Sequence, residues 1–330
     1  MATPFTQTEL TEPVNLKSDQ FYDDVIAGLK STPKRLNSKY FYDAKGDKLF
    51  QDLMNCVEYY PTKCELEIFS EKTADICQAI MGDGGPFDLI ELGAGDATKS
   101  AYLLQHLLEQ KADFIYKPID ISDNVISYLT ITLPVTLPGI KINGLNGEYF
   151  NMLKQAAAGS DRRKVILFLG SNIGNMPVTD ATNFCKELRK HLNKGDMVLM
   201  GFDLKKNPAT ILAAYNDRGG ITKRFNLNLL TRINRELNAD FDLTKFEHYP
   251  TYDPESGACK SYLVSIDDQE VTINGKETIP FLKDEHIYME ISQKFTVFQT
   301  EQMAEKAGFQ PVDRFFDSKK WFADVIWIAE

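Results

Sequence analysis

Between residues 87 and 204, short apolar runs alternate with longer segments of helical periodicity, and this alternation constrains the fold more than any other feature of the sequence. The segments 99–110 and 180–192 carry apolar residues at the spacing of an amphipathic helix. The apolar runs around them have the length of buried strands: 87-FDLIEL-92, 114-FIYKPID-120, 165-VILFLG-170, 197-MVLMGFDL-204 and, more weakly, 139-GIKINGL-145. Continuous apolar strands separated by helices are typical of a parallel sheet covered on both faces. We therefore predict a doubly wound α/β core.

The end of the chain predicts a different pairing of strands. A helical segment at 299–309 precedes two strand-like runs, 310-QPVDRFF-316 and 321-WFADVIWIAE-330, which are separated by a short polar segment. Two such runs indicate a closing antiparallel hairpin. A parallel nucleotide-binding sheet that ends in an antiparallel hairpin is the element order of class I, Rossmann-like methyltransferases. Ordinary dehydrogenases usually lack that ending.

Residues 206–290 are more than this sheet needs. They combine helical segments with β-like runs, and they follow the carboxyl end of a strand, where open α/β sheets bind ligands. The aromatic-rich N-terminal residues are expected to pack with them. We therefore predict a cofactor-binding methyltransferase domain formed by 61–205 and 291–330. A discontinuous α+β substrate-binding domain, or lid, is predicted from 1–60 and 206–290.

The composition excludes several classes of partner. The chain has 330 residues and a net charge of −10, and an acidic surface repels nucleic acid. The N-terminus lacks the basic and apolar regions of a signal peptide, and no apolar run is long enough to span a bilayer. The five cysteines form no CxxC pair and the four histidines are widely separated, so we expect no metal site. The expectation is a cytoplasmic monomer without nucleic-acid or membrane partners.

The segment 91-ELGAGDATKS-100 joins the first apolar strand to a helix and predicts half of a nucleotide site. Gly93 and Gly95 allow a tight backbone turn beneath a nucleotide, with the helix N-terminus behind it. Thr98 stands where the dinucleotide fingerprint GxGxxG has its third glycine, so the segment departs from that motif. Asp120, at the end of the second strand, can accept both hydroxyls of a ribose. Alternatively, Asp120 caps the next helix.

Two further segments offer polar groups behind predicted strands. In 146-NGEYF-150, Glu148 can bind an adenine amino group and Tyr149 can stack on the base. The stretch 168-FLGSNIGNMP-177 crowds glycine, serine and asparagine residues behind a buried strand. Glycine lets the backbone approach a ligand closely, and asparagine both donates and accepts hydrogen bonds. This stretch is therefore either an elaborate turn or the floor of a binding site.

Several blocks along the chain form a combination that is more specific than any one of them. The blocks are 40-YFYDAKGDKLF-50, 58-EYYPTKCE-65, 91-ELGAGDATKS-100, 168-FLGSNIGNMP-177, 213-AAYND-217, 225-FNLNLLTRINRELNADFD-242 and 289-MEISQKF-295. In this order they resemble the histidine Nα-methyltransferase family of ergothioneine biosynthesis, over nearly the whole chain. That family uses S-adenosylmethionine to trimethylate the α-amine of free histidine, which gives hercynine. Fungal members of the superfamily methylate tryptophan-derived amines.

The resemblance implies a role for each matching residue. Cofactor binding is implied for Gly93, Lys99 and Asp120, with Glu148 and Tyr149 at the adenine. The substrate carboxylate is expected at Asn175 and Tyr215, and the imidazole at Tyr59, Glu290 and Ser292. Tyr42, Phe50 and Gly170 are expected to surround the α-amine. The stretch at 168–177 is thus expected to meet both cofactor and amino acid.

Four of these residues also have interpretations without a ligand. Glu290 fits a solvent-facing position on an edge strand, and Tyr59 fits a core ring. Tyr215 fits helix packing, and Asn175 fits a helix cap. One departure from the family bears on the substrate: near 260-KSYLV-264 the histidine enzymes carry a methionine beside the imidazole, where this chain has Ser261. That change makes the wall of the pocket smaller and more polar, which weakens the preference for histidine.

The implied chemistry needs few reactive groups. Methyl transfer from a sulfonium to an amine is an in-line displacement that requires a neutral amine, aligned and shielded from water. No strong base or covalent nucleophile is needed. An aromatic pocket beside the sulfonium lowers the pKa of the amine, and Tyr42 can relay the departing proton through water. The faces of Tyr42 and Phe50 also suit the successively methylated amines through cation–π contact.

Three alternative functions stay open at this point. The first is the same N-methylation of another amino acid, such as tryptophan, although Glu290 leaves little room for an indole. The second is an NAD-dependent oxidoreductase, which the absent third glycine and the C-terminal hairpin disfavour. The third is a non-catalytic protein that binds S-adenosylmethionine, against which the large insertion argues.

Overall fold

The chain divides into two compact units. The computed structural model describes residues 16–82, 84–158 and 160–330. Unit 1 is built from the described part of Met1–Leu49 with Lys223–Tyr249 and Tyr262–Glu290, and unit 2 from Phe50–Thr222, Pro250–Ser261 and Ile291–Glu330. Phe50, Tyr59 and Tyr215 thus belong to unit 2. The predicted split into a cofactor domain and a substrate domain stays a prediction about function.

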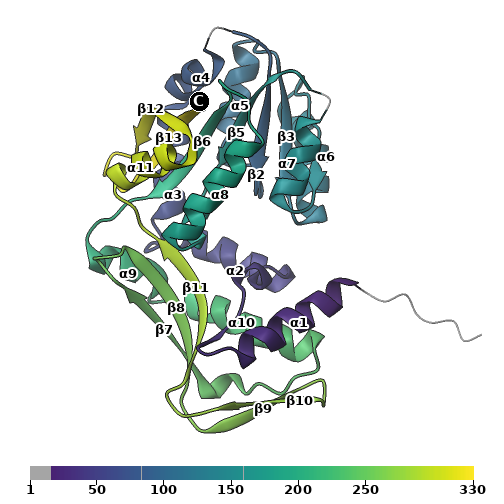
Figure 1. The fold of residues 1–330 in the computed structure, drawn as a ribbon, viewed down its shortest axis with the longest axis vertical. Helices are drawn as coiled ribbons and strands as arrows, with labels where there is room; N and C mark the ends of the chain where they lie inside the picture. Colours follow the sequence, from purple (N-terminus) through teal and green to yellow (C-terminus); the bar gives the residue numbers. More distant parts are fainter. Residues whose placement is uncertain (1–15, 83, 159) are drawn as a thin grey trace, which may run out of the picture. The chain divides into compact units, whose positions relative to one another are not determined.

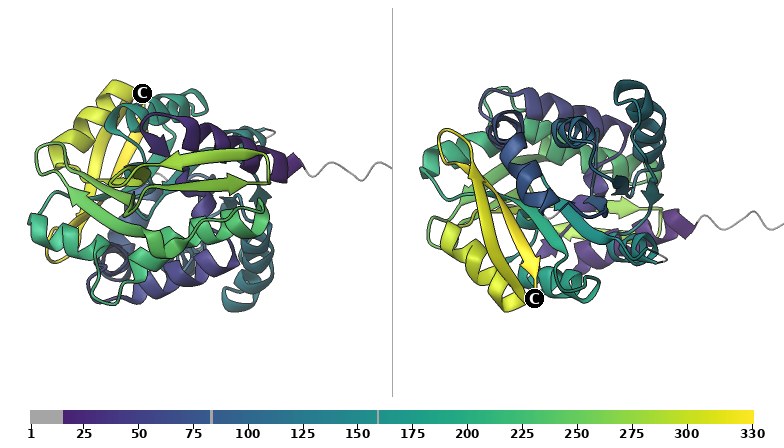
Figure 2. Two further views of the ribbon diagram at one scale, coloured as in Figure 1. Left: turned by 90° about the horizontal axis from the view of Figure 1, so that it is seen from below. Right: turned by 90° about the horizontal axis from the view of Figure 1, so that it is seen from above.

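Unit 2 contains a seven-stranded sheet with the order β12-β13-β6-β5-β2-β3-β4 (Figure 1). Its strands are β2 (Phe87–Leu92), β3 (Phe114–Asp120), β4 (Leu145–Asn146), β5 (Arg163–Phe168), β6 (Met197–Asp203), β12 (Phe309–Phe316) and β13 (Phe322–Ala329). Strands β2 to β6 pair in parallel, whereas β13 is antiparallel to both of its neighbours. Figure 2 shows the closing hairpin of β12 and β13 from two further directions. The predicted doubly wound sheet with an antiparallel C-terminal hairpin is confirmed.

Helices cover both faces of this sheet because its central strands are apolar on both sides. In β2, Leu89 packs in one core cluster with residues of α3, α4 and α5, whereas its neighbour Ile90 packs in a second cluster with residues of α7, α8 and α11. The helices are α3 (Pro61–Glu71), α4 (Thr73–Met81), α5 (Ser100–Glu109), α6 (Asp123–Thr136), α7 (Tyr149–Ala157), α8 (Val178–Lys190), α9 (Pro208–Tyr215) and α11 (Val297–Ala307). Because strands β2 to β6 pair in parallel, their carboxyl ends lie at one edge of the sheet, where open α/β sheets bind ligands.

The weak strand predicted at 139–145 is mostly not a strand. Only β4 pairs with the end of β3, and an isolated bridge joins Tyr116 to Ile142. Gly144 gives a physical reason, because a Cβ atom there would lie 2.6 Å from the side chain of Ile126. The chain passes closely over α6 at this point, so a regular ladder with alternating side chains does not form.

Unit 1 is an α+β unit with an aromatic core. It holds all or part of α1 (Leu16–Lys30), β1 (Lys34–Arg35), η1 (Ser38–Phe41), α2 (Ala44–Asn55), α10 (Ile221–Glu236), β7 (Phe246–Tyr252), β8 (Ala258–Ser265), β9 (Gln269–Ile273), β10 (Glu277–Phe281) and β11 (His286–Gln293). One sheet has the order β1-β11-β8-β7, and β9 and β10 form a hairpin. The rings of Phe241, Phe246 and Phe281 contact one another, with centroids 5.3–6.1 Å apart.

Within the ranges given above, no helix is long and apolar enough to cross a membrane. The same residues contain no group of three or more His, Cys, Asp or Glu side chains placed to hold a metal ion.

Candidate active site

The glycine turn after β2 lies against the start of α7 and the end of β3. Gly93 and Gly95 adopt left-handed backbone angles, with φ of +73° and +54°. A Cβ atom on Gly93 would lie 2.8 Å from the phenolic oxygen of Tyr149, at the start of α7. The N–H of Gly95 donates to Oδ2 of Asp120, at the end of β3 (3.3 Å). Four residues that were predicted to bind one nucleotide thus lie around one turn.

Asp120 does not cap the following helix. Ser122 is the N-cap residue of α6, and its hydroxyl accepts the N–H of Val125. Asp120 instead accepts the N–H of Ser122 through Oδ1 (2.9 Å), which fixes its carboxylate beside the glycine turn. The helix-cap interpretation is therefore wrong, and the geometry leaves the carboxylate placed to accept ribose hydroxyls.

The predicted adenine residues stand at the start of α7. Glu148 is the exposed residue that precedes this helix, and its side chain makes no capping hydrogen bond. The ring of Tyr149 contacts that of Phe168 at 5.9 Å. Burial, and then the charges of Asp120 and Glu148, raise the pKa of Tyr149 to about 12, so the phenol stays neutral. An aromatic wall beside two carboxylates and a glycine turn fits an adenosine-bearing cofactor.

Glu65 joins the cofactor half of the site to Gly170. This carboxylate lies fully buried in α3. Its Oε2 pairs with the ammonium of Lys99, and its Oε1 accepts the N–H of Gly170 (2.7 Å). Burial lowers the pKa of Lys99, but the charge of Glu65 more than offsets this and the pKa is raised, so Lys99 is an ammonium ion. Sequence reasoning placed Lys99 and Gly170 at the site but missed Glu65.

The stretch at 168–177 is more than a simple turn, because it packs closely against the ends of two other strands. Gly170 and Ser171 adopt φ of +74° and +56°, and the short helix η2 (Asn172–Asn175) follows. The hydroxyl of Ser171 accepts the N–H of Asp203, at the end of β6 (3.0 Å). A Cβ atom on Gly174 would lie 2.8 Å from the carbonyl oxygen of Gln293, at the end of β11. The stretch thus holds the ends of β5, β6 and β11 together.

Asn175 ends η2 and is exposed to solvent. It is not a helix cap, because Ser171 is the N-cap residue of η2 and Pro177 that of α8. Its amide is therefore available for the substrate role that the resemblance implies, and this role stays a prediction.

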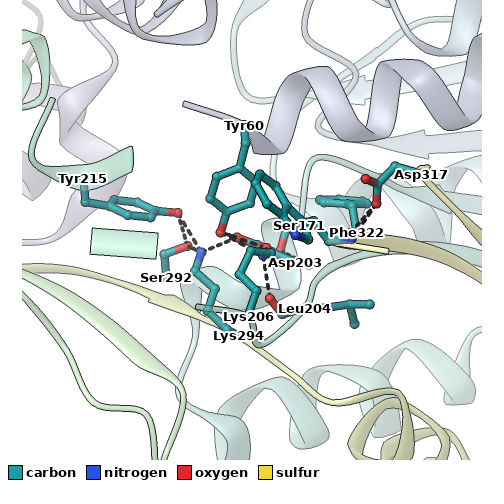
Figure 3. Close-up of polar contacts among 11 residues, drawn as sticks. Tyr60, Ser171, Asp203, Leu204, Lys206, Tyr215, Ser292, Lys294, Asp317 and Phe322 are labelled. Carbon is teal, nitrogen blue, oxygen red and sulfur yellow. Dashed lines mark hydrogen bonds and ion pairs between the residues drawn. The ribbon is translucent and has the colours of Figure 1, made fainter. Parts of the chain in front are cut away.

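Tyr215 and Ser292, both predicted to bind substrate, share a hydrogen bond of 2.7 Å (Figure 3). The ammonium of Lys294 lies 2.7 Å from each of the two hydroxyl oxygens. It also lies 2.6 Å from Oδ2 of Asp203. Tyr215 packs in the core, as the simpler interpretation holds, but its hydroxyl group also belongs to a polar network. Lys294 was not predicted.

Asp203 is the centre of this network. It accepts a hydrogen bond from the hydroxyl of Tyr60 (2.8 Å) and pairs with the ammonium of Lys206. Burial raises the pKa of Asp203, but the charges of Lys294 and Lys206 outweigh burial and hold the pKa below its usual range. Burial lowers the pKa of Lys206. Asp203 stands at the carboxyl end of a strand, as Asp120 does, and that position was the available sequence signal.

Three aromatic rings of unit 2 follow one another edge to face. The ring centroids of Phe50 and Tyr59 lie 6.5 Å apart, and those of Tyr59 and Tyr215 lie 6.1 Å apart. Tyr59 is half-buried against the core, so it is both a packing residue and a neighbour of the polar network. Phe50 is likewise half-buried. Phe50, predicted at the amine, Tyr59, predicted at the imidazole, and Tyr215, predicted at the carboxylate, therefore form one continuous series of rings.

In unit 1, helix α10 contacts the two other predicted residues. Phe225 packs edge to face against Tyr42 (5.8 Å between centroids), whose side chain is 47% exposed. The next residue, Asn226, donates to Oε1 of Glu290 (3.4 Å). Glu290 lies in β11, which stands between β1 and β8 in the sheet order, but β1 pairs with Ile287 and Tyr288 rather than with Glu290, so both interpretations of Glu290 stay predictions. Asn226 is a further residue that sequence reasoning missed.

Ser261 does not share a face of the sheet with Glu290. The ring of Tyr262, the next residue in β8, contacts the ring of Tyr288 in β11 (5.8 Å). Side chains alternate along a strand, so Ser261 points to the opposite face from Tyr262 and Tyr288, while Glu290 points to the same face as Tyr288. Ser261 is also buried. The role of Ser261 as a polar wall beside the imidazole stays a prediction, and Tyr262 is the residue of β8 that shares a face with Tyr288.

The chain is similar to known proteins along most of its length. The model of a family described as histidine-specific methyltransferase, SAM-dependent, matches residues 21–329. The histidine N-alpha-methyltransferase of Mycobacterium tuberculosis is 34% identical over 82% of this chain and 83% of its own length. Ergothioneine biosynthesis protein 1 of Schizosaccharomyces pombe is 27% identical over 85% of this chain and 37% of its own length. The L-tryptophan methyltransferase of Psilocybe serbica is 27% identical over 89% of each chain.

Proposed function

Because this chain belongs to the family of histidine-specific, S-adenosylmethionine-dependent methyltransferases, we propose that it methylates the α-amine of free L-histidine three times, giving hercynine. One observation carries the proposal. Glu65 binds both Lys99, assigned to the cofactor, and the N–H of Gly170, assigned to the surroundings of the amine. A single buried carboxylate thus aligns the two halves of a methyl-transfer site. The NAD-dependent alternative is set aside by the family match.

The cofactor is assigned to the turn after β2 and its neighbours. Gly93 and Gly95 bring the backbone close to the nucleotide, and Asp120 accepts the ribose hydroxyls. Glu148 and Tyr149 bind the adenine, and Lys99 completes the set. When bound, S-adenosylmethionine supplies an electrophilic methyl group. The protein contributes position and shielding rather than covalent chemistry.

The amino acid is assigned to polar groups at its two ends. Asn175 and Tyr215 donate hydrogen bonds to the carboxylate. Ser292 and Tyr59 recognise the imidazole, and the carboxylate of Glu290 accepts an imidazole N–H. A site built to bond an N–H rejects analogues that leave its carboxylate unpaired, which gives the side-chain preference.

The α-amine is assigned to Tyr42, Phe50 and Gly170. Attack on the methyl group needs the neutral amine, and a partly exposed Tyr42 can pass the released proton to water. Aromatic faces accept an amine with any number of methyl groups through cation–π contact. A carboxylate at this position would instead grip the ammonium form and hinder the later rounds.

Mass spectrometry tests this function. Purified protein is incubated with S-adenosylmethionine and each of the twenty standard amino acids, and products are scored for one, two or three added methyl groups. We expect a trimethylated product from L-histidine alone. A methylated product from tryptophan or another amino acid instead of histidine would support N-methylation but contradict histidine as the substrate. Tight binding of the cofactor with no product from any amino acid would support the non-catalytic alternative.

A further inference from the structure

Two buried lysines flank one buried carboxylate in unit 2. Lys294 lies 2.6 Å from one oxygen of Asp203, and Lys206 pairs with the other (Figure 3). The side chains of Lys294, Asp203 and Lys206 are 0%, 1% and 5% exposed. Among the described residues, Asp203 is the one carboxylate that pairs with either lysine. The cluster thus contains one more positive charge than negative charge, which is costly to bury without a further anion.

The other carboxylate labelled in Figure 3, Asp317, does not supply that anion. Asp317, which lies apart from the two lysines in Figure 3, accepts the backbone N–H groups of Lys319, Trp321 and Phe322 at 2.7–3.0 Å. Its oxygens are therefore occupied by its own loop. The surplus positive charge therefore stays on the Lys294–Asp203–Lys206 cluster, to which Tyr215 and Ser292 are hydrogen-bonded.

The hydrogen bonds of Lys294 also direct the two hydroxyl groups. An ammonium has three N–H donors, and those of Lys294 face Asp203, Tyr215 and Ser292. Both hydroxyl oxygens consequently accept from Lys294. The Tyr215 hydroxyl donates to the Ser292 hydroxyl at 2.7 Å. The second proton of the pair, on Ser292 in this arrangement, must point away from Lys294. If both hydroxyl groups rotate, Ser292 donates to Tyr215, and Tyr215 then has the proton that points away.

We propose that Lys294 is a positioning residue that makes this site selective for substrates with an α-carboxylate over amines that lack one. The inference rests on the proposed function, in which Tyr215 binds the carboxylate. Lys294 is fully buried, so it acts through Tyr215 and Ser292 rather than by contact. A carboxylate accepts the remaining hydroxyl proton and balances the surplus charge of the cluster. Histamine has the same imidazole and amine but no carboxylate, so it neither accepts that proton nor balances that charge.

Calorimetric titration in the presence of S-adenosylhomocysteine measures this selectivity without turnover. The ratio of the affinities for L-histidine and histamine is compared between the wild type and Lys294→Gln, which keeps N–H donors but loses the charge. We expect the ratio to fall about tenfold, through loss of histidine affinity, with histamine affinity within about twofold. Lys205→Gln is the matched control, because Lys205 donates to the carbonyl of Glu255 (2.7 Å) and, within the described part of the chain, forms no hydrogen bond or ion pair with a carboxylate. Its ratio should equal that of the wild type.

A second variant covers the case in which Lys294→Gln does not fold. Lys206→Gln removes one positive charge from the same cluster and leaves the contacts of Lys294 with both hydroxyl groups in place. We expect a smaller fall in the ratio, about threefold. An unchanged ratio in the folded variants, or an equal loss for both ligands, would overturn the inference. A wild type that neither binds nor methylates histidine would instead count against the proposed function.

Discussion

The ammonium nitrogen of Lys294 lies 2.7 Å from the phenolic oxygen of Tyr215. This contact ties the end of α9 to the segment after β11, and through Asp203 to the end of β6. Tyr215 therefore belongs to a network that includes the buried charges of Lys294 and Asp203. A tyrosine held in this way keeps a fixed direction for hydrogen bonding, which a substrate site needs.

Replacing Glu65 with glutamine should weaken cofactor binding about tenfold, or roughly 1.4 kcal/mol. The amide still offers an oxygen to the N–H of Gly170, but Lys99 loses its anionic partner. Calorimetric titration with S-adenosylhomocysteine measures the change. Glu71→Gln, at an exposed position of the same helix, serves as control and should bind like the wild type. A Glu65→Gln affinity within twofold of the wild type would show that Glu65 does not position Lys99.

Alanine at Gly93 should impair cofactor binding more than alanine at Gly95. Both positions have positive φ, so both substitutions cost about 1–2 kcal/mol in backbone strain. Only Gly93 adds a clash, because its Cβ would lie 2.8 Å from the phenolic oxygen of Tyr149, whereas nothing lies within 4 Å at Gly95. Adding Tyr149→Phe to Gly93→Ala removes that oxygen and should restore part of the affinity. Equal losses at the two glycines would contradict this account of the turn.

Glu290→Gln should raise the KM for L-histidine at least tenfold, since a neutral amide is a weaker acceptor for an imidazole N–H. The affinity for S-adenosylhomocysteine should not change. Glu247→Gln, at an exposed position in unit 1, provides the control. Steady-state kinetics with varied histidine separates KM from kcat. If Glu290→Gln lowers kcat alone, the assignment of Glu290 to the imidazole fails.

Burial raises the pKa of Glu91 to about 7, while the hydroxyl of Tyr116 donates to its carboxylate (2.6 Å). Between the ordinary glutamate pKa and this value, the folded protein binds more protons than the unfolded chain. This group therefore makes the free energy of unfolding fall as the pH rises toward 7, by at most about 1.4 kcal/mol per pH unit.

Glu91→Gln should flatten this dependence, because glutamine does not titrate but still accepts from Tyr116. Urea unfolding at pH 5, 6 and 7 measures the slope. The exposed Glu109→Gln should keep the slope of the wild type. A Glu91→Gln protein with the wild-type slope would mean that Glu91 is ionised throughout this range.

The central strands β2, β3, β5 and β6 were predictable because each is a mostly apolar run buried on both faces. Helix α6 was not predicted, since its threonines and Pro134 argue against a helix. The structure shows how the threonines fit: the hydroxyls of Thr130 and Thr132 donate to the carbonyls one turn earlier, at 2.7 and 2.8 Å. These hydrogen bonds occupy hydroxyl groups that would otherwise draw the backbone into non-helical hydrogen bonds.

The candidate site was predictable where its residues lie at the end of a strand or in the turn after it, as for Gly93, Asp120 and Gly170. The supporting charges were not. Glu65 occupies a buried position of α3, and Lys294 finds Asp203 across a long stretch of chain. Nothing local in the sequence indicates which carboxylate will neutralise a buried lysine. Only the fold brings such partners together.

The position of the transferred methyl groups tests the central claim most directly. L-histidine is incubated with S-adenosylmethionine carrying a ¹³C-labelled methyl group, and the product is analysed by two-dimensional NMR. The account predicts three equivalent labelled methyl groups that correlate with the α-carbon of histidine. Labelled methyl groups on an imidazole nitrogen, or no labelled histidine at all, would contradict it.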